Sequence, residues 1–323
     1  MPREDNVKQM KHLLAAALLL ASFQAGAQFP AKPVTIVVPF PAGATTDTIA
    51  RIIAQHASTS LGRPVLIDNK PGAEGQLAAQ EVVKAAPDGY RIMLGTSGNL
   101  SVLPASRKNP PYDVVNDFTP VADVGRYQFF VYAHPALPAR TFKEFIDYAR
   151  SNPGKLSYAT GNNTGVINMA GFRSAHGLDM VHVPYKGEPP AMVDLLAGRV
   201  QVMVATGIGI PYARDGKLRM LAALLPKRSP LAPDVPTLKE AGQKDLDVIL
   251  FAGLVGPAGI PADVVERLNR DFNAALSNAD VIAQIEKLGF TLTPSRADAF
   301  GTMLREQLAV YRKAVREAGL PIE

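Results

Sequence analysis

The sequence predicts an α/β protein that is large enough to form two lobes. A short β-branched segment is followed by a small-residue loop and then by a segment of helical spacing over residues 34–61. The same order of strand, loop and helix recurs over residues 155–175. About 296 residues remain once the N-terminal leader described below is set aside, which is enough for two hydrophobic cores.

The N-terminus has the pattern of an export signal. Basic residues up to His12 precede the apolar run Leu13–Leu20, and Ala25-Gly26-Ala27 fits a small-residue cleavage site. The apolar run is too short to span a membrane, which takes about 20 residues. We therefore predict that residues 1–27 are a signal peptide and that the protein works in the periplasm. A start at Met10 instead of Met1 would leave a compact signal of the same kind.

Composition excludes several kinds of site. The chain has no cysteine, so it forms neither disulfides nor thiolate metal centres and has no cysteine nucleophile. Its formal net charge of +5 is spread along the sequence and forms no basic block of the kind that binds nucleic acid. We expect no cofactor, no metal and no nucleic-acid partner, whereas the mild positive charge suits an anionic ligand.

The first strand and helix are joined by a loop that favours an anion. Val34–Val38 is a β-branched strand, and the prolines after it end the strand because they lack an N–H donor. Small residues and helix-capping residue types fill the loop: Ala42, Gly43, Ala44, Thr45, Thr46 and Asp47. A helix over Thr48–Leu61 would direct its free N–H groups and its dipole at this loop. The alternative, a plain connection capped by Asp47, is the commoner arrangement.

A second unit of strand, loop and helix follows, and then a third strand. These elements are predicted at residues 64–69 (strand), 76–86 (helix) and 91–94 (strand). In an open α/β sheet the ligand lies beyond the carboxyl ends of the strands. The loop after the third strand, which contains Thr96, Ser97 and Gly98, is therefore expected to share one wall with the loop over residues 40–47.

A series of motifs in a fixed order resembles one protein family. In chain order they are PVTIVVPFPAG, DNKPGAEG, APDGYRIMLGTSG, VHVPYKGEPPAMVDLLAGRV, GKLRMLA, KRSPLAPDVPTLKEAG and GLVGPAGIP. They cover essentially the whole mature chain and are similar to those of the Bug family, the periplasmic solute-binding proteins of tripartite tricarboxylate transporters. The resemblance implies a two-lobed binding-protein fold of type II with the ligand in the cleft between the lobes. It also implies capture of a small solute, often a carboxylate, and its delivery to membrane transporter subunits.

The resemblance assigns the remaining elements to two lobes, residues 28–128 with 249–323 and residues 129–248. In the second lobe a strand over Lys155–Thr160 leads through the loop Gly161–Gly165 into a helix over Val166–Ala175. Two helix N-termini would then face each other across the cleft and suit a ligand with an anionic group at each end. Further strands are predicted at 118–126, 129–133, 181–184, 200–205, 218–224 and 251–255, and further helices at 142–150, 191–197, 262–277, 279–288 and 296–318. Core candidates in the last helices are Leu276, Ile282, Ile285, Leu288, Leu304 and Leu308.

The predicted ligand-binding site consists mainly of loop backbone and small polar side chains. The first lobe would contribute Ala42, Gly43, Ala44, Thr45, Thr46, Asp47, Thr96, Ser97 and Gly98, and the second lobe Asn163, Thr164 and Gly165. Phe40 and Tyr185 are candidate aromatic walls. Either could instead cover the hinge side of the cleft, and for Tyr185 the two alternatives are equally favoured.

Two further candidates, Ala205 and Thr206, bear on the charge of the ligand. They occupy the place where some family members carry a carboxylate that meets an amino group of the ligand. Neither side chain ionises, so the pocket is predicted to be neutral and to disfavour an amino acid. A dicarboxylate or an aromatic acid, which needs only hydrogen-bond donors, fits this prediction better.

Three well-known catalytic motifs are absent from the sequence. There is no G-x-S-x-G nucleophile elbow, phosphate-binding P-loop or H-E-x-x-H pair. His182 is better explained as a hydrogen-bonding residue at a strand edge, and Asp194 as a solvated helix position. We therefore predict a monomeric binding protein that is not an enzyme. A periplasmic sensor of the same fold is the main alternative, and a secreted α/β hydrolase is a more distant one.

Overall fold

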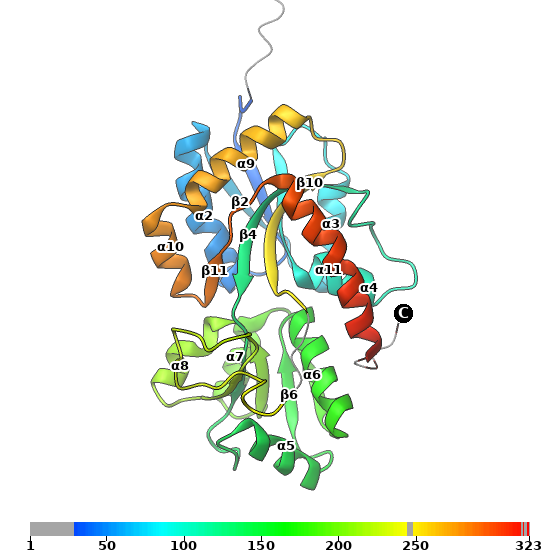
Figure 1. Cartoon of the computed structure of the whole chain (residues 1–323), viewed down its shortest axis with the longest axis vertical. Helices are drawn as coiled ribbons and strands as arrows, with labels where there is room; N and C mark the ends of the chain where they lie inside the picture. The colour runs from blue at the N-terminus through cyan, green and yellow to red at the C-terminus, as the bar shows by residue number, and fades with distance from the viewer. Residues whose placement is uncertain (1–28, 244–247, 318, 320–321, 323) are drawn as a thin grey trace, which may run out of the picture.

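The computed structural model describes residues 29–243, 248–317, 319 and 322. Figure 1 shows two lobes, one above the other along the long axis of the molecule, with the chain passing between them. The predicted signal peptide lies outside the described residues. Within the described part of the chain, no helix combines the length and the apolar character needed to cross a membrane.

The first lobe is built on a six-stranded sheet with the order β11-β4-β10-β3-β1-β2. Its strands are β1 (Val34–Val38), β2 (Val65–Asn69), β3 (Arg91–Thr96), β4 (Phe118–Tyr127), β10 (Phe251–Pro257) and β11 (Phe290–Leu292). Strand β1 pairs in parallel with β2 and β3, whereas β10 is antiparallel to β3 and β4, and β11 is antiparallel to β4. The carboxyl ends of the three parallel strands meet at one edge, where the loops of the predicted site begin.

The second lobe contains a five-stranded sheet with the order β7-β6-β8-β5-β9. Its strands are β5 (Phe130–Ala133), β6 (Ser157–Thr160), β7 (Val181–Pro184), β8 (Val202–Ala205) and β9 (Arg219–Ala223). Strand β6 is parallel to β7 and β8, while β5 is antiparallel to β8 and β9. Both sheets therefore place three parallel strands beside an antiparallel strand, which is followed by two further strands in the first sheet and by one in the second.

The chain crosses between the lobes at two places. Gln128 and Phe129 connect β4 to β5, and the long segment between β9 and β10 returns the chain to the first sheet. This architecture of two α/β lobes confirms the predicted fold class. The residues at which one lobe ends and the other begins stay a prediction.

Helices cover both faces of the first sheet. Along β1, Ile36 and Val38 face one apolar cluster and Val37 faces another, as the alternation of a strand requires. In Figure 1, α9 and α10 lie beside α2, and α3, α4 and α11 lie together on the other side of the lobe. The helices are α2 (Thr45–Leu61), α3 (Gln76–Val83), α4 (Leu103–Ala105), α5 (Phe142–Ser151), α6 (Asn163–His176), α7 (Glu188–Leu196), α8 (Ile210–Arg214), α9 (Ala262–Leu276), α10 (Ala279–Glu286) and α11 (Ala297–Glu317).

Three helices begin three residues earlier than the sequence predicts. Helix α2 starts at Thr45, α6 at Asn163 and α7 at Glu188. The residue types thought to precede α2 as caps therefore form its first turn, and the N-cap position itself is held by Ala44 without a side-chain hydrogen bond. The predicted start of α2 was wrong because polar residues suit the first turn of a helix as well as its N-cap. They do so when their side chains bond to the preceding loop, as Asp47 does to Gly43, or line a pocket.

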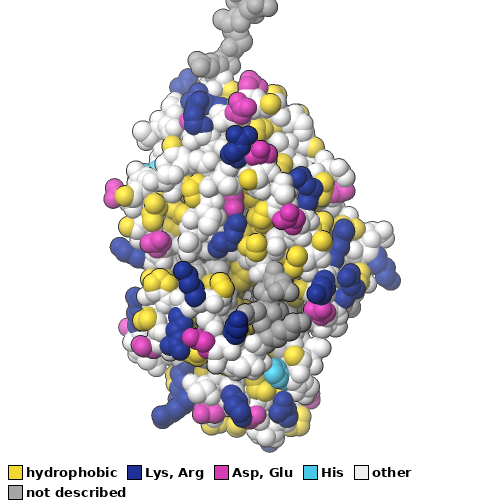
Figure 2. Space-filling view, in the orientation of Figure 1, with side chains coloured by type: hydrophobic (Ala, Val, Ile, Leu, Met, Phe, Trp, Pro, Cys, Tyr) yellow, Lys and Arg dark blue, Asp and Glu magenta, His cyan; other side chains and the backbone are white. Residues whose placement is uncertain are grey.

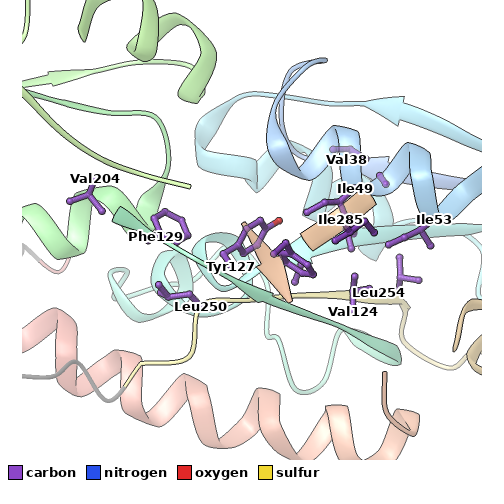
Figure 3. Packing of buried hydrophobic residues seen from close by; sticks show 14 of the residues in the cluster. Val38, Ile49, Ile53, Val124, Tyr127, Phe129, Val204, Leu250, Leu254 and Ile285 are labelled. Atoms are coloured by element: carbon purple, nitrogen blue, oxygen red, sulfur yellow. The ribbon is translucent and has the colours of Figure 1, made fainter. Parts of the chain in front are cut away.

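The cores of the two lobes meet at the crossing segment. Figure 3 shows Tyr127 and Phe129 between apolar residues of the first lobe, such as Ile49, and Val204 of the second. Tyr127 packs edge-on against Phe129, with ring centroids 6.0 Å apart. Four of the predicted core residues are buried, whereas Ile282 and Leu288 are only partly buried.

Charged side chains are dispersed over the surface in view. On the face shown in Figure 2, basic and acidic residues alternate without a large patch of one sign. On this face the structure agrees with the dispersed charge of the sequence.

Candidate ligand-binding site

A pocket lies between the two lobes, beside the crossing segment. Its empty volume, open solvent included, is about 390 Å³. The described residues that line it are Phe40, Ala44, Thr45, Thr46, Thr96, Ser97, Gly98, Tyr127, Phe129, Asn162, Thr164, Glu188 and Thr206. More than half of the residues predicted from the sequence are thus brought together around one pocket. That they contact a ligand stays a prediction.

The first lobe presents the N-terminus of α2 to the pocket. Thr45 and Thr46 are the first two residues of this helix, so their N–H groups have no acceptor within it. The buried hydroxyl of Thr46 shares a 2.7 Å hydrogen bond with the hydroxyl of Tyr127. Burial raises the pKa of Tyr127, so this phenol keeps its proton. Neutral donors beside a helix N-terminus favour a carboxylate group.

The end of β3 completes this wall. The side chain of Asn99 accepts a hydrogen bond from the N–H of Thr96 at 2.9 Å, and the hydroxyl of Tyr112 donates to the carbonyl of Asn99. These bonds hold the turn that carries Ser97 and Gly98 into the pocket lining. Ser97 and Thr96 are buried, so their hydroxyls add donors without adding charge.

The second lobe presents the N-terminus of α6 and the first residue of α7. Asn162 caps α6 by accepting from the N–H of Gly165 at 2.7 Å, and its side-chain nitrogen donates to Oε1 of Glu188 at 2.7 Å. Thr206, which follows β8, donates from its N–H to the same oxygen at 3.0 Å and from its hydroxyl to Oε2. Three neutral donors therefore hold the buried carboxyl group of Glu188.

Polar contacts join the two lobes around the pocket. Thr45 and Thr206 share a hydrogen bond of 2.8 Å between their hydroxyls. The side-chain nitrogen of Asn163 donates to the carbonyl of Gly98 at 3.0 Å. Because each bond links a residue of one lobe to a residue of the other, the described structure is a closed arrangement in which small hydroxyl and amide groups bring the walls together.

The remaining predicted residues lie outside the pocket lining. Ala42 and Gly43 are exposed, whereas Asp47, Asn163, Gly165 and Ala205 are buried beside the lining residues. Tyr185 is not among the residues lining this pocket: its ring packs on the second lobe and its hydroxyl donates to Asp194 at 2.6 Å. Its contact with a ligand stays a prediction. The carbonyl oxygen of Val204 lies close over Gly165, so that an added β-carbon there would be only 3.0 Å from it.

Four lining residues were not among the predicted ones: Tyr127, Phe129, Asn162 and Glu188. The two aromatic residues stand at the crossing between the lobes, a position that the sequence indicates and that could have suggested them. Asn162 lies in the loop already singled out and is recognisable as a cap type. Glu188 was hidden by the late predicted start of α7, although Pro189 and Pro190 after it are typical of a first helical turn.

The predicted neutrality of the pocket is wrong. Ala205 and Thr206 cannot ionise, yet α7 brings the carboxyl group of Glu188 onto Thr206 from another part of the chain. Burial raises the pKa of Glu188 to about 6, although the hydrogen bonds from Thr206 and Asn162 act in the opposite direction. The pocket therefore contains one titratable acid.

Other residues considered from the sequence have structural partners. The ring of His182 stacks on Tyr158 at 4.9 Å and its Nε2 shares a 2.7 Å hydrogen bond with the hydroxyl of Thr160. Asp194 also accepts from Arg199 at 2.7 Å. Over the described ranges, no cluster of three or more His, Cys, Asp or Glu side chains could hold a metal ion.

A second and larger cavity opens on another side of the crossing segment. Its empty volume is about 1490 Å³, and basic residues such as Arg126 and Lys227 line it together with apolar ones. It includes Val248, next to the undescribed residues 244–247, and none of its lining residues belongs to the first turn of a helix. We therefore take the smaller pocket as the candidate site.

Asp47 holds the loop in front of α2, and its replacement should loosen that loop. Its buried carboxylate accepts from the N–H of Gly43 at 2.9 Å, from Asn69 at 2.9 Å and from Arg51 at 3.1 Å. Asp47→Asn would turn an amide nitrogen toward the Arg51 donor, and we expect a loss of about 2 kcal/mol in the free energy of unfolding. Urea denaturation at pH 7 measures it, with the exposed Asp263→Asn in the first turn of α9 as the control.

The effect of Asp47→Asn should depend on pH. Burial alone would raise the pKa of Asp47, but the bonds from Arg51, Asn69 and Gly43 outweigh it and hold the pKa below its usual value of 3.8. The carboxylate therefore stabilises the fold above pH 3.8, and this stabilisation is lost as the pH falls through the lowered pKa. An equal difference between the native protein and the variant at pH 7 and at pH 3 would contradict this account.

Comparison with known proteins places the chain among transporter receptors. A family model described as "Tripartite tricarboxylate transporter family receptor" matches residues 49–320. A protein of Pseudomonas sp. (strain P51), described as "UPF0065 protein in tcbD-tcbE intergenic region", is 32% identical over 327 residues, covering 98% of this chain and 96% of its own.

Two solved structures are similar to this chain over most of its length. An R. palustris protein with adipate is 30% identical, with a TM-score of 0.86 and coverage of 91% and 99%. MatC from Rhodopseudomonas palustris with bound malate is 31% identical, with a TM-score of 0.84 and coverage of 89% and 100%.

Proposed function

This chain belongs to the tripartite tricarboxylate transporter receptor family, and from that premise we propose that it captures a small carboxylate in the periplasm. The resemblance inferred from its motifs is confirmed by the family match. We propose further that it binds its ligand without converting it and delivers it to the membrane subunits of a transporter.

One observation carries the proposal. The pocket between the lobes combines the first turn of α2, the first turn of α6 and a ring of buried hydroxyl groups. The N–H groups of Thr45 and Thr46 have no acceptor inside their helix, and a carboxylate would supply one. Charge-assisted hydrogen bonds of this kind contribute about 1.5–3 kcal/mol each. The malate and adipate held by the two similar structures are carboxylates and agree with this reading.

Thermal shift measurements over three matched sets of acids test the proposal. The sets are propionate, lactate and alanine; succinate, malate and aspartate; and benzoate, salicylate and anthranilate. Within each set the carboxylate skeleton is constant and one carbon carries hydrogen, hydroxyl or an amino group. At least one acid should raise the free energy of unfolding by about 2.7 kcal/mol when its free concentration is 100 times its dissociation constant.

Glucose serves as the uncharged control, and it should produce no shift. The bound acid should also be recovered unchanged after prolonged incubation with the protein. The proposal fails if no carboxylate in the three sets stabilises the protein, or if the protein converts the acid that it binds.

A further inference from the structure

Glu188 is a buried acid in the wall of the pocket, and its recorded hydrogen-bond partners are neutral. It is 5% exposed, and its three donors are the side chain of Asn162 and the N–H and hydroxyl of Thr206. A carboxylate has about four acceptor positions, so the protein donors leave room for one more. No Lys, Arg or His is among the described residues that line the pocket.

Glu188 also lies close to the place where the ligand carboxylate is expected. The hydroxyl of Thr206 donates to Glu188 and shares a 2.8 Å hydrogen bond with the hydroxyl of Thr45 in the first turn of α2. Two hydroxyl groups, those of Thr206 and Thr45, therefore connect the acid of the protein to the helix N-terminus that favours an anion. A ligand with only carboxylate oxygens would bring two like charges together in a buried space, which is unfavourable.

A hydrogen-bond donor on the ligand resolves this conflict. A hydroxyl or ammonium group on a carbon near the ligand carboxylate could use the remaining acceptor position of Glu188 while the carboxylate binds the N-terminus of α2. The two similar structures hold malate, which has such a hydroxyl, and adipate, which does not. The family fold therefore does not decide whether the ligand carries such a donor, whereas the side chains of this pocket do.

We propose that Glu188 is a specificity-determining residue and that the ligand of this protein is a carboxylate with a hydroxyl or ammonium group close to its carboxylate. This inference rests on the proposed function and names the class of acid within it. It replaces the prediction, drawn from Ala205 and Thr206, that the pocket disfavours an amino acid.

Calorimetry with the matched set that binds most tightly tests the inference. In the native protein, the hydroxy or amino acid should bind at least about tenfold more tightly than the unsubstituted acid of the same skeleton. Glu188→Gln keeps the shape but removes the charge, and it should reduce this preference to about threefold or less, chiefly by improving the binding of the unsubstituted acid. The hydroxy and amino acids of the set distinguish the two kinds of donor. Only the amino acid, whose ammonium would form an ion pair with Glu188, should also lose affinity because that ion pair is absent from the variant.

Glu286→Gln, an exposed position on α10, is the matched control and should leave the preference unchanged. Circular dichroism verifies that each variant is folded, and Glu188→Ala takes the place of the glutamine variant if the latter is not. The inference is overturned if the unsubstituted acid is the tightest ligand of its set, or if the preference survives in the Glu188 variant. Those results would leave the proposed function standing, whereas the absence of binding by every carboxylate would remove both.

The pH dependence of binding gives a second readout. Because burial raises the pKa of Glu188 to about 6, the group is protonated well below that pH and then no longer repels a ligand carboxylate. The affinity for the ionised form of the unsubstituted acid, corrected for the titration of the acid itself, should therefore increase from pH 8 to pH 5 in the native protein and stay nearly constant in Glu188→Gln. Among the described residues, Tyr127 and Tyr132 interact electrostatically with Glu188, and burial keeps both protonated. Asp194, also on α7, is bonded to Tyr185 and Arg199. A pH dependence that persists in the variant would contradict the inference.

Discussion

Gly98→Val should lower the affinity for the ligand by about a hundredfold or more, equivalent to about 2.7 kcal/mol of binding free energy. Gly98 lines the pocket, and a β-carbon there would lie 3.4 Å from the β-carbon of Asn163 in the other lobe. The two methyl groups of valine would extend farther into the space that the ligand needs and would hold the lobes apart. The backbone of Gly98 lies outside the left-handed region, so valine should not strain it locally.

Calorimetry on the tightest ligand of the matched acid sets measures this effect. Gly171→Val on α6 is the control, because a β-carbon at Gly171 has no neighbour within 4 Å. It should bind as the native protein does, and both variants should keep the native circular dichroism spectrum. If Gly98→Val binds the ligand with native affinity, the site lies elsewhere.

Gly253→Ala should destabilise the protein by about 3 kcal/mol, at the upper end of what overpacking of a core costs. Gly253 belongs to β10, between β3 and β4, and its added β-carbon would clash with the Cζ atom of Phe300. The ring of Phe300 is fully buried on α11, so it cannot move away without displacing the helix. Urea denaturation followed by circular dichroism measures the loss.

A second substitution can test the cause of this loss. Phe300→Leu removes the clashing ring atoms, so the double variant with Gly253→Ala should be less destabilised than the sum of the two single variants. A coupling of about 1 kcal/mol or more is expected for residues in direct contact. Additive effects, or a Gly253→Ala protein as stable as the native one, would show that the sheet and α11 are not packed as described.

Local sequence determined most of the secondary structure. The β-branched run of β1 and the small-residue loop after it identify a strand and a helix N-terminus, because backbone donors and side-chain shape act over a few residues. The same reasoning identified the loop that opens α6. The order of motifs over the whole chain then supplied the family and the two-lobed architecture, which the periodicity of single segments does not contain.

Only the tertiary structure decided which side chains share the pocket. Thr45 and Thr206 are bonded although 161 residues separate them, and Glu188 reaches Thr206 from a helix whose start the sequence places too late. Tyr185 has the residue type of a pocket wall, yet its hydroxyl bonds to Asp194. Strands and helices follow from neighbours along the chain, whereas the charge of a pocket depends on side chains that are distant in sequence and meet only in the tertiary structure.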